Sequence, residues 1–145
     1  MRKLPLFFIL ILLLFSIAAG WTQDGSVKRS IVVVFDLSYS MTMIESDTGL
    51  SRYALGIAAL ERIFEKSTGE EEWSLIVCED AESTFTAGDF TTDPDKFIPM
   101  LRDREPWGRT SVDTMVLAGT RGFSSAVDGS DKFLLLITDG VHTTG

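Results

Sequence analysis

The sequence predicts an α/β protein: a three-layer α/β/α sandwich of the Rossmann-like kind, with a mostly parallel sheet and one short antiparallel edge strand. Two unbroken apolar runs, valine-rich at 31–35 and leucine-rich at 133–137, are typical of parallel strands buried on both faces. Segments with apolar residues at helical spacing lie between them. Strands that alternate with helices in this way predict a parallel sheet with helices on both faces.

The domain begins with a strand at 30–35, which a helix at 50–66 follows. The expected inward face of this helix consists of Leu50, Tyr53, Ala54, Ile57, Leu60 and Phe64. Ser51, Thr48 or Asp47 is expected to cap its start, and Gly69 to end it. The acidic residues 70–72 are expected to form a solvated turn.

A second buried strand is predicted at 73–78. A tight connection leads to residues 83–87, which alternate polar and apolar and so predict a short antiparallel strand. Pro94 is expected at the first position of a helix over 94–103. Phe97, Met100 and Leu101 would point inward, and Pro99 predicts a kink or a break.

The last helix is predicted to open at residues 110–113, TSVD, a variant of the capping box. Its apolar stripe is Val112, Met115, Val116, Gly119 and Phe123. After a turn at 128–131, the final buried strand covers 132–138 and ends in Asp139-Gly140.

Residues 1–20 have the pattern of a secretory signal peptide. Arg2 and Lys3 precede an apolar run at 6–15, and small residues at 18–20 offer a cleavage site. The run is shorter than the roughly 20 residues that a membrane span needs. We therefore expect a secreted, periplasmic or extracellular protein, with an uncleaved anchor over 4–19 as the alternative. The organisation is then signal 1–20, connector 21–29 and domain 30–145.

Charge and cysteine content restrict the functional classes. Removal of residues 1–20 lowers the basic residues from 13 to 11 against 21 acidic residues, so the net charge changes from −8 to −10. This charge opposes binding to nucleic acid or to an anionic membrane surface. The single cysteine, Cys78, cannot form an internal disulfide and is expected to be buried.

Oxygen-bearing side chains follow the predicted strands at their carboxyl ends. Asp36, Ser38 and Ser40 come after the first strand, Asp139 after the last, and Thr110 stands at a helix start. In open α/β sheets, ligands bind beyond the carboxyl ends of the strands. Carboxylates and hydroxyls are hard ligands that suit Mg²⁺ or Mn²⁺. Taken singly, the hydroxyls would be ordinary caps and turn formers.

Three motifs together resemble a von Willebrand factor type A domain: DLSYS at 36–40, GRT at 108–110 and TDG at 138–140. The resemblance implies a metal-ion-dependent adhesion site. Ser38 and Ser40 would ligate the metal, Thr110 would bind it directly or through water, and Asp36 and Asp139 would act mostly through bridging waters. One coordination position would be left for an acidic residue of a protein partner.

Two positions depart from the family pattern. Tyr39 stands between the serines, where glycine is frequent, and Arg109 replaces the second glycine of the usual GGT. Both would flank the metal and influence which ligand binds. The resemblance further implies a sheet with more strands than this chain offers before Gly145. We therefore expect a partial domain whose strand 132–138 is an exposed edge, poorly soluble unless another chain completes the sheet.

Two alternatives to a metal-dependent interaction module remain. A hydrolase would use Ser38, Ser40 or a metal-activated water, but the chain has one histidine, His142, and no G-x-S-x-G motif for a serine–histidine relay. We therefore do not expect an enzyme. The second alternative is a non-functional fragment of a longer protein.

Overall fold

The valine-rich strand lies in the middle of the sheet. The computed structural model describes residues 27–80, 84–86 and 89–140. In it, β1 (Arg29–Asp36) pairs in parallel with β2 (Glu71–Cys78) on one side and with β4 (Asp131–Ile137) on the other. A short strand, β3 (Thr84–Thr86), pairs antiparallel with β2, so the strand order is β3-β2-β1-β4. The predicted mostly parallel sheet with an antiparallel edge strand is confirmed.

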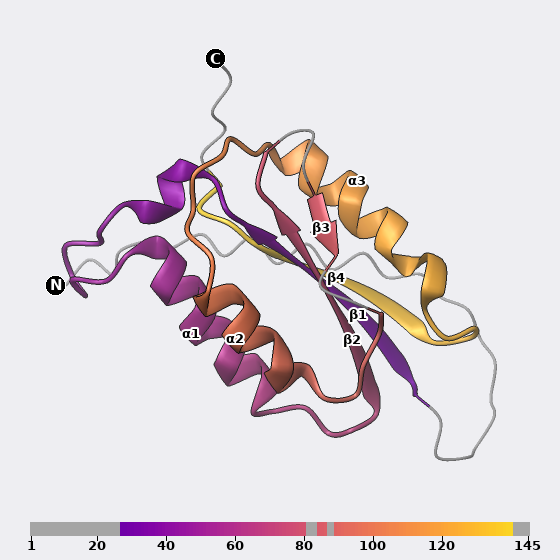
Figure 1. Cartoon of the computed structure of the whole chain (residues 1–145). Coiled ribbons are helices and arrows are strands. Elements are labelled where there is room, and N and C mark those ends of the chain that lie inside the picture. Colours follow the sequence, from indigo (N-terminus) through magenta and orange to yellow (C-terminus); the bar gives the residue numbers. More distant parts are fainter. Residues whose placement is uncertain (1–26, 81–83, 87–88, 141–145) are drawn as a thin grey trace, which may run out of the picture.

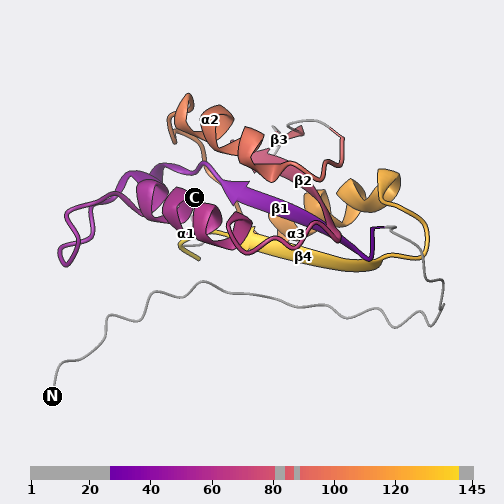
Figure 2. The same ribbon diagram turned by 90° about the horizontal axis from the view of Figure 1, so that it is seen from below.

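Helices cover both faces of this sheet. Helices α1 (Arg52–Phe64) and α2 (Phe97–Arg102) lie on one face and α3 (Val112–Gly122) on the other (Figure 1). Figure 2 shows the same layers in a second view. Three short 3₁₀ helices complete the described elements: η1 (Tyr39–Thr42), η2 (Pro94–Lys96) and η3 (Phe123–Ser125). The three-layer sandwich is therefore confirmed.

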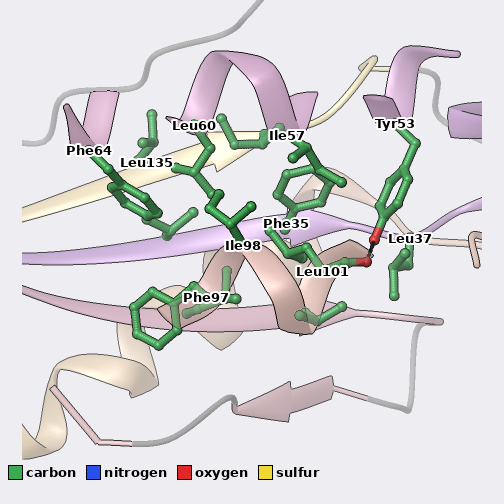
Figure 3. Close-up of a cluster of buried hydrophobic side chains, with 14 of the residues drawn as sticks. Phe35, Leu37, Tyr53, Ile57, Leu60, Phe64, Phe97, Ile98, Leu101 and Leu135 are labelled. Atoms are coloured by element: carbon green, nitrogen blue, oxygen red, sulfur yellow. Dashed lines mark hydrogen bonds between the residues drawn. The ribbon is translucent and has the colours of Figure 1, made fainter. Parts of the chain in front are cut away.

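The larger core lies between the sheet and the pair α1 and α2. Alternate residues of β1, including Val33 and Phe35, face this side and are fully buried. Figure 3 shows Leu60 of α1 and Leu101 of α2 among the side chains gathered there. The hydroxyl of Tyr53 donates a hydrogen bond to the backbone carbonyl of Leu101, so its polar end is satisfied inside the core.

The second core lies between the sheet and α3, and a glycine of α3 allows the helix to approach the sheet closely. Val32 and Val34, the other alternate residues of β1, pack there with Met115 and Leu134. A Cβ atom on Gly119 would lie 2.2 Å from Cδ1 of Leu134, closer than any packed pair of carbons. The missing side chain therefore lets α3 pack closely against the sheet.

Helix boundaries were predicted in part. Ser51 accepts a hydrogen bond from the amide of Ala54 at 3.1 Å and caps α1, as one of the three named candidates. The end at Gly69 was wrong, because α1 ends at Phe64 and Gly69 turns the chain later, with φ +82°. Leu50 was also placed wrongly: it precedes the helix and is exposed.

The break predicted around Pro99 lies before that residue. The chain passes from η2 to α2 at Phe97, which puts Pro99 in the first turn of α2. The missing amide hydrogen of proline costs no intrahelical bond in a first turn. Pro94 opens η2 as predicted, whereas Ile98 is more deeply buried than Met100.

The acidic turn predicted at 70–72 was wrong in two of its three residues. Glu71 and Glu72 are the first residues of β2 and are 5% and 7% exposed. Glu72 accepts a hydrogen bond from Ser30 of β1, and Glu71 is held by its near neighbour Thr68 and by an ion pair with Arg29 of β1. Sequence periodicity does not reveal these partners. The prediction that Cys78 is buried is confirmed.

The predicted signal peptide, residues 1–20, lies outside the described residues. The connector is described only from residue 27 onward, where it leads into β1. Within the described part of the chain, no helix is both long and apolar enough to span a membrane.

Candidate metal centre

The centre begins where β1 ends. Asp36 is the last residue of β1 and is 2% exposed. Its Oδ1 accepts a hydrogen bond from the backbone amide of Ser38 at 2.7 Å, a turn that aspartate favours because its side chain can bond the backbone two residues later. The hydroxyl oxygens of Ser38 and Ser40 then lie 3.0 Å apart, and both side chains are buried.

The segment before α3 is joined to this turn through the backbone. Ser38 and Gly108 form a parallel bridge, and the amide of Tyr39 donates to the carbonyl of Gly108 at 2.8 Å. Only glycine fits at 108, because a Cβ atom there would lie 1.4 Å from the carbonyl oxygen of Glu79. The Gly108 part of the GRT motif therefore has a structural reason that is independent of any ligand.

Thr110 is thereby brought beside the end of β1. It is 4% exposed, and its hydroxyl donates to the carbonyl of Cys78 at 3.2 Å. The same carbonyl accepts the amide of Leu37, the residue that follows Asp36. Ser111 caps α3 by accepting from the amide of Thr114, which fixes the start of the helix next to Thr110.

The third contribution comes from the end of β4, the strand next to β1. The hydroxyl of Thr138 donates to Oδ2 of Asp36 at 2.7 Å, and Asp139 follows with a side chain that is 3% exposed. The structure thus brings all five predicted residues to one edge of the sheet: Asp36, Ser38, Ser40, Thr110 and Asp139. In Figure 1 this edge lies near η1, toward which β1 and β4 both run.

Three residues in this region were not predicted from the sequence. Thr138 holds Asp36, while Arg52 bonds Oδ2 of Asp139 through Nη1 at 2.8 Å and Oε1 of Glu45 through Nε at 2.6 Å. Thr138 stands directly before Asp139 in the TDG motif, which was a usable signal. Arg52 and Glu45 carry no motif, and only the fold shows that they reach this edge.

The electrostatics of the centre disfavour the ionised form of Asp36. Burial raises the pKa of Asp36 above its ordinary value, hydrogen bonds from Ser38 and Thr138 oppose that rise, and the nearby charge of Asp139 adds to it. Burial together with the charge of Asp36 raises the pKa of the Cys78 thiol to about 12, so this cysteine stays a neutral packing residue.

The donor set fits a hard divalent cation. Neighbouring carboxylates that repel one another gain from a cation placed between them, and serine and threonine hydroxyls are acceptable ligands for Mg²⁺ or Mn²⁺. Among the described residues, no group of three or more histidine, cysteine, aspartate or glutamate side chains could hold a metal. The chain's one histidine, His142, lies outside the described residues.

Comparison with solved structures identifies the fold. The VWA domain of SpRpn10 matches with a TM-score of 0.68 and 15% identity over 82% of this chain and 64% of that one. BatB from Bacteroides thetaiotaomicron matches with a TM-score of 0.63 and 23% identity over 80% and 56% of the two chains. Three N-terminal domains of the type V pili tip protein Mfa5 from Porphyromonas gingivalis match with a TM-score of 0.62 and 22% identity over 77% and 19%.

The chain therefore has a von Willebrand factor A-like fold, as the sequence motifs suggested. It spans less than two thirds of the length of each of these three structures. No family model matches the sequence, and no curated protein matches it closely enough to count as a relative.

Proposed function

We propose that this chain is a metal-dependent protein-interaction module that captures an acidic residue of a protein partner. The observation that carries the proposal is the arrangement at the carboxyl edge of the sheet: the 3.0 Å pair of Ser38 and Ser40 hydroxyls beside the buried Asp36. Thr110 and Asp139 reach the same edge from two other segments. Mg²⁺ or Mn²⁺ is the cation that this oxygen set suits best.

The roles of the residues follow from their charges and bonds. Ser38, Ser40 and Thr110 would hold the cation with neutral oxygens, which leave much of its charge uncompensated. Asp36 orients the turn through its bond to the Ser38 amide and, with Asp139, balances the cation at a distance. When bound, the metal would supply an electrophilic position for an external carboxylate.

The surface around this edge also suits a protein partner. Among the described residues, seven large apolar side chains are exposed, and five of them lie on η1 and the loops at this edge: Tyr39, Met43, Ile44, Leu50 and Trp107. Tyr39 is 69% exposed and Trp107 is 62% exposed. Exposed aromatic residues grouped beside a polar site are typical of protein-binding surfaces. Arg109, which is exposed next to Trp107, would add a positive charge to this surface.

An extracytoplasmic location is part of the proposal. The signal pattern at residues 1–20 supports it, as does the similarity to a protein described as a pilus tip component. Contact with a membrane would then occur only through an uncleaved signal. The acidic balance of the chain argues against a nucleic-acid partner.

Calorimetric titration with Mg²⁺ and Mn²⁺ tests the metal part of the proposal. We expect one cation per chain, with binding lost in Asp36→Ala and strongly weakened in Ser38→Ala. Asp128→Ala is the matched control, because Asp128 is exposed in the turn before β4, at the opposite edge. The circular dichroism of each variant shows whether it is folded. Binding to Ser38→Ala and Ser40→Ala as tight as to the parent would contradict the proposal.

Water-proton relaxation of the Mn²⁺-loaded protein tests carboxylate capture separately. Acetate should displace metal-bound water and lower the relaxation rate, while the neutral analogue acetamide should have little effect. Equal effects of the two probes would contradict carboxylate capture and leave metal binding intact.

A further inference from the structure

Arg52 occupies an unusual place for a basic residue. It is the first residue of α1, and the first turn of that helix contains no acidic residue. A helix N-terminus carries partial positive charge and disfavours a cation there. Local helix electrostatics therefore do not explain the arginine, and its contacts outside the helix must offset the cost.

Those contacts are two carboxylates, one of which belongs to the candidate metal centre. Nη1 lies 2.8 Å from Oδ2 of Asp139 and Nε lies 2.6 Å from Oε1 of Glu45. The side chains of Arg52, Asp139 and Glu45 are 21%, 3% and 27% exposed. Solvent screens a pair this enclosed less than a surface pair. The two carboxylates, through hydrogen bonds and charge, raise the pKa of Arg52 further above its already high ordinary value.

A cavity next to the contacts of Arg52 with Asp139 and Glu45 offers space for a second position of the Arg52 guanidinium. This cavity of about 260 Å³ is bounded by Arg52 and Asp139 and also by Glu45 and Asp47. If Arg52 released Asp139, it could keep its bond to Glu45, and Asp47 also lines the cavity. The rest of the lining is mostly apolar, so the retained bond to Glu45 is what would hold the guanidinium once the ion pair opens.

We propose that Arg52 is a built-in counter-cation of the metal centre, which neutralises Asp139 in the metal-free protein and competes with the divalent cation for it. This inference rests on the metal centre of the proposed function. Cation binding then requires the exchange of one positive partner of Asp139 for another. The exchange lowers metal affinity. It also links metal occupancy to Glu45, the second partner of Arg52. The loop that carries Glu45 is closed by two backbone hydrogen bonds, from the amide of Glu45 to the carbonyl of Leu50 and from the amide of Gly49 to the carbonyl of Glu45.

Mn²⁺ binding measured by electron paramagnetic resonance tests the competition. Removal of the competing charge in Arg52→Gln should tighten Mn²⁺ binding about tenfold. The loss of one charge-assisted hydrogen bond to Asp139 changes a binding constant by about this factor. Arg52→Lys keeps the charge but loses the planar fork and should give an intermediate value. Arg102→Gln is the matched control, because Arg102 pairs with Glu61 on the exposed surface of α2.

A double-mutant cycle distinguishes direct pairing from a general charge effect. In an Asp139→Asn background, Arg52→Gln should give no further gain in Mn²⁺ affinity. Unfolding by urea in the presence of EDTA gives a readout without metal: Arg52→Gln should lower the midpoint, and adding Asp139→Asn should recover part of the loss.

The outcomes separate this inference from the proposed function. Equal Mn²⁺ affinity of the parent and Arg52→Gln would overturn the inference and leave the proposed function standing. Binding by Arg52→Gln alone would support both. Absence of binding in both proteins, each shown to be folded, would overturn both.

Discussion

The two edges of the parallel sheet both bury acidic side chains, but they satisfy them differently. At the amino edge, Oε1 of Glu72 accepts from the hydroxyl of Ser30 at 2.5 Å and from the amide of Val127 at 2.7 Å. At the carboxyl edge, Asp36 accepts from one amide and one hydroxyl and also lies near the charge of Asp139.

The pKa directions of Glu71 at the amino edge and Asp36 at the carboxyl edge are opposite. Burial acts to raise the pKa of Glu71, but bonds from Thr68 and Ser67 and the charge of Arg29 bring it below its ordinary value. Burial and Asp139 bring the pKa of Asp36 above its ordinary value despite the hydrogen bonds from Ser38 and Thr138. Donors of the chain itself bond both acids of the amino edge, whereas at the carboxyl edge the pKa of Asp36 stays raised, and there we expect an added cation to be favourable. The same residue types therefore serve structure at one edge and a candidate site at the other.

The largest expected effect comes from Gly108→Ala, which breaks the carboxyl edge. The new methyl group would collide with the backbone carbonyl of Glu79, so the segment that carries Thr110 must shift. We expect a loss of roughly 3 kcal/mol or more in the free energy of unfolding, measured with urea, because backbone cannot yield as a side chain can. Gly49→Ala is the control: its φ of +70° costs about 1 kcal/mol, but its surroundings are open. Equal losses in the two variants would contradict the proposed packing role of Gly108.

A smaller effect is expected from Glu72→Ala, which breaks the amino edge. Removal of the carboxylate leaves the amide of Val127 and the hydroxyl of Ser30 without this acceptor, at a cost of roughly 2–3 kcal/mol in urea unfolding. Glu72→Gln keeps an oxygen acceptor and should cost less.

The matching change at the other edge sharpens the comparison. Asp36→Asn should cost less than Glu72→Gln, both measured in EDTA, because the lost charge of Asp36 was buried near Asp139. A larger loss for Asp36→Asn would mean that the carboxyl edge is as well satisfied as the amino edge.

The smallest effect concerns pH. The pKa of Glu71 is lowered in the folded protein, so the stability that this group contributes is present above about pH 4.5 and is lost as the pH falls through the folded-state pKa. Glu71→Gln should therefore flatten the fall of stability with decreasing pH below that value, measured by thermal unfolding. A parallel shift of the whole curve with unchanged slope would assign the effect to packing instead.

Much of this fold could be read from periodicity, since β1, β2, β4 and the three α-helices follow apolar spacing. Helix ends could not: α1 ends at Phe64, whose ring packs against Trp73 and Phe97, and not at the glycine that the sequence offers, Gly69. Glu72 appeared solvated because its donors, Ser30 and Val127, come from distant segments, and Glu71 because its ion-pair partner Arg29 lies on another strand.

The candidate site, like the fold, contains residues that the sequence could predict and residues that it could not. Asp36, Ser38, Ser40, Thr110 and Asp139 could be named because motif residues follow strand ends or open a helix, and the fold brings them to one edge. Their role as metal ligands stays a prediction. Arg52 could not be predicted, since its partner Asp139 is 87 residues away in the sequence and no motif marks it.

The most direct test of the central claim is anomalous diffraction from crystals of the protein grown with Mn²⁺. We predict one strong anomalous peak at metal–ligand distance from the hydroxyl oxygens of Ser38 and Ser40. This distance is about 2.1 Å for an ion of the size of Mg²⁺. Asp36 and Asp139 should lie around the peak. Peaks only elsewhere on the molecule, or a folded protein with Mn²⁺ in excess and no peak at this edge, would contradict the account.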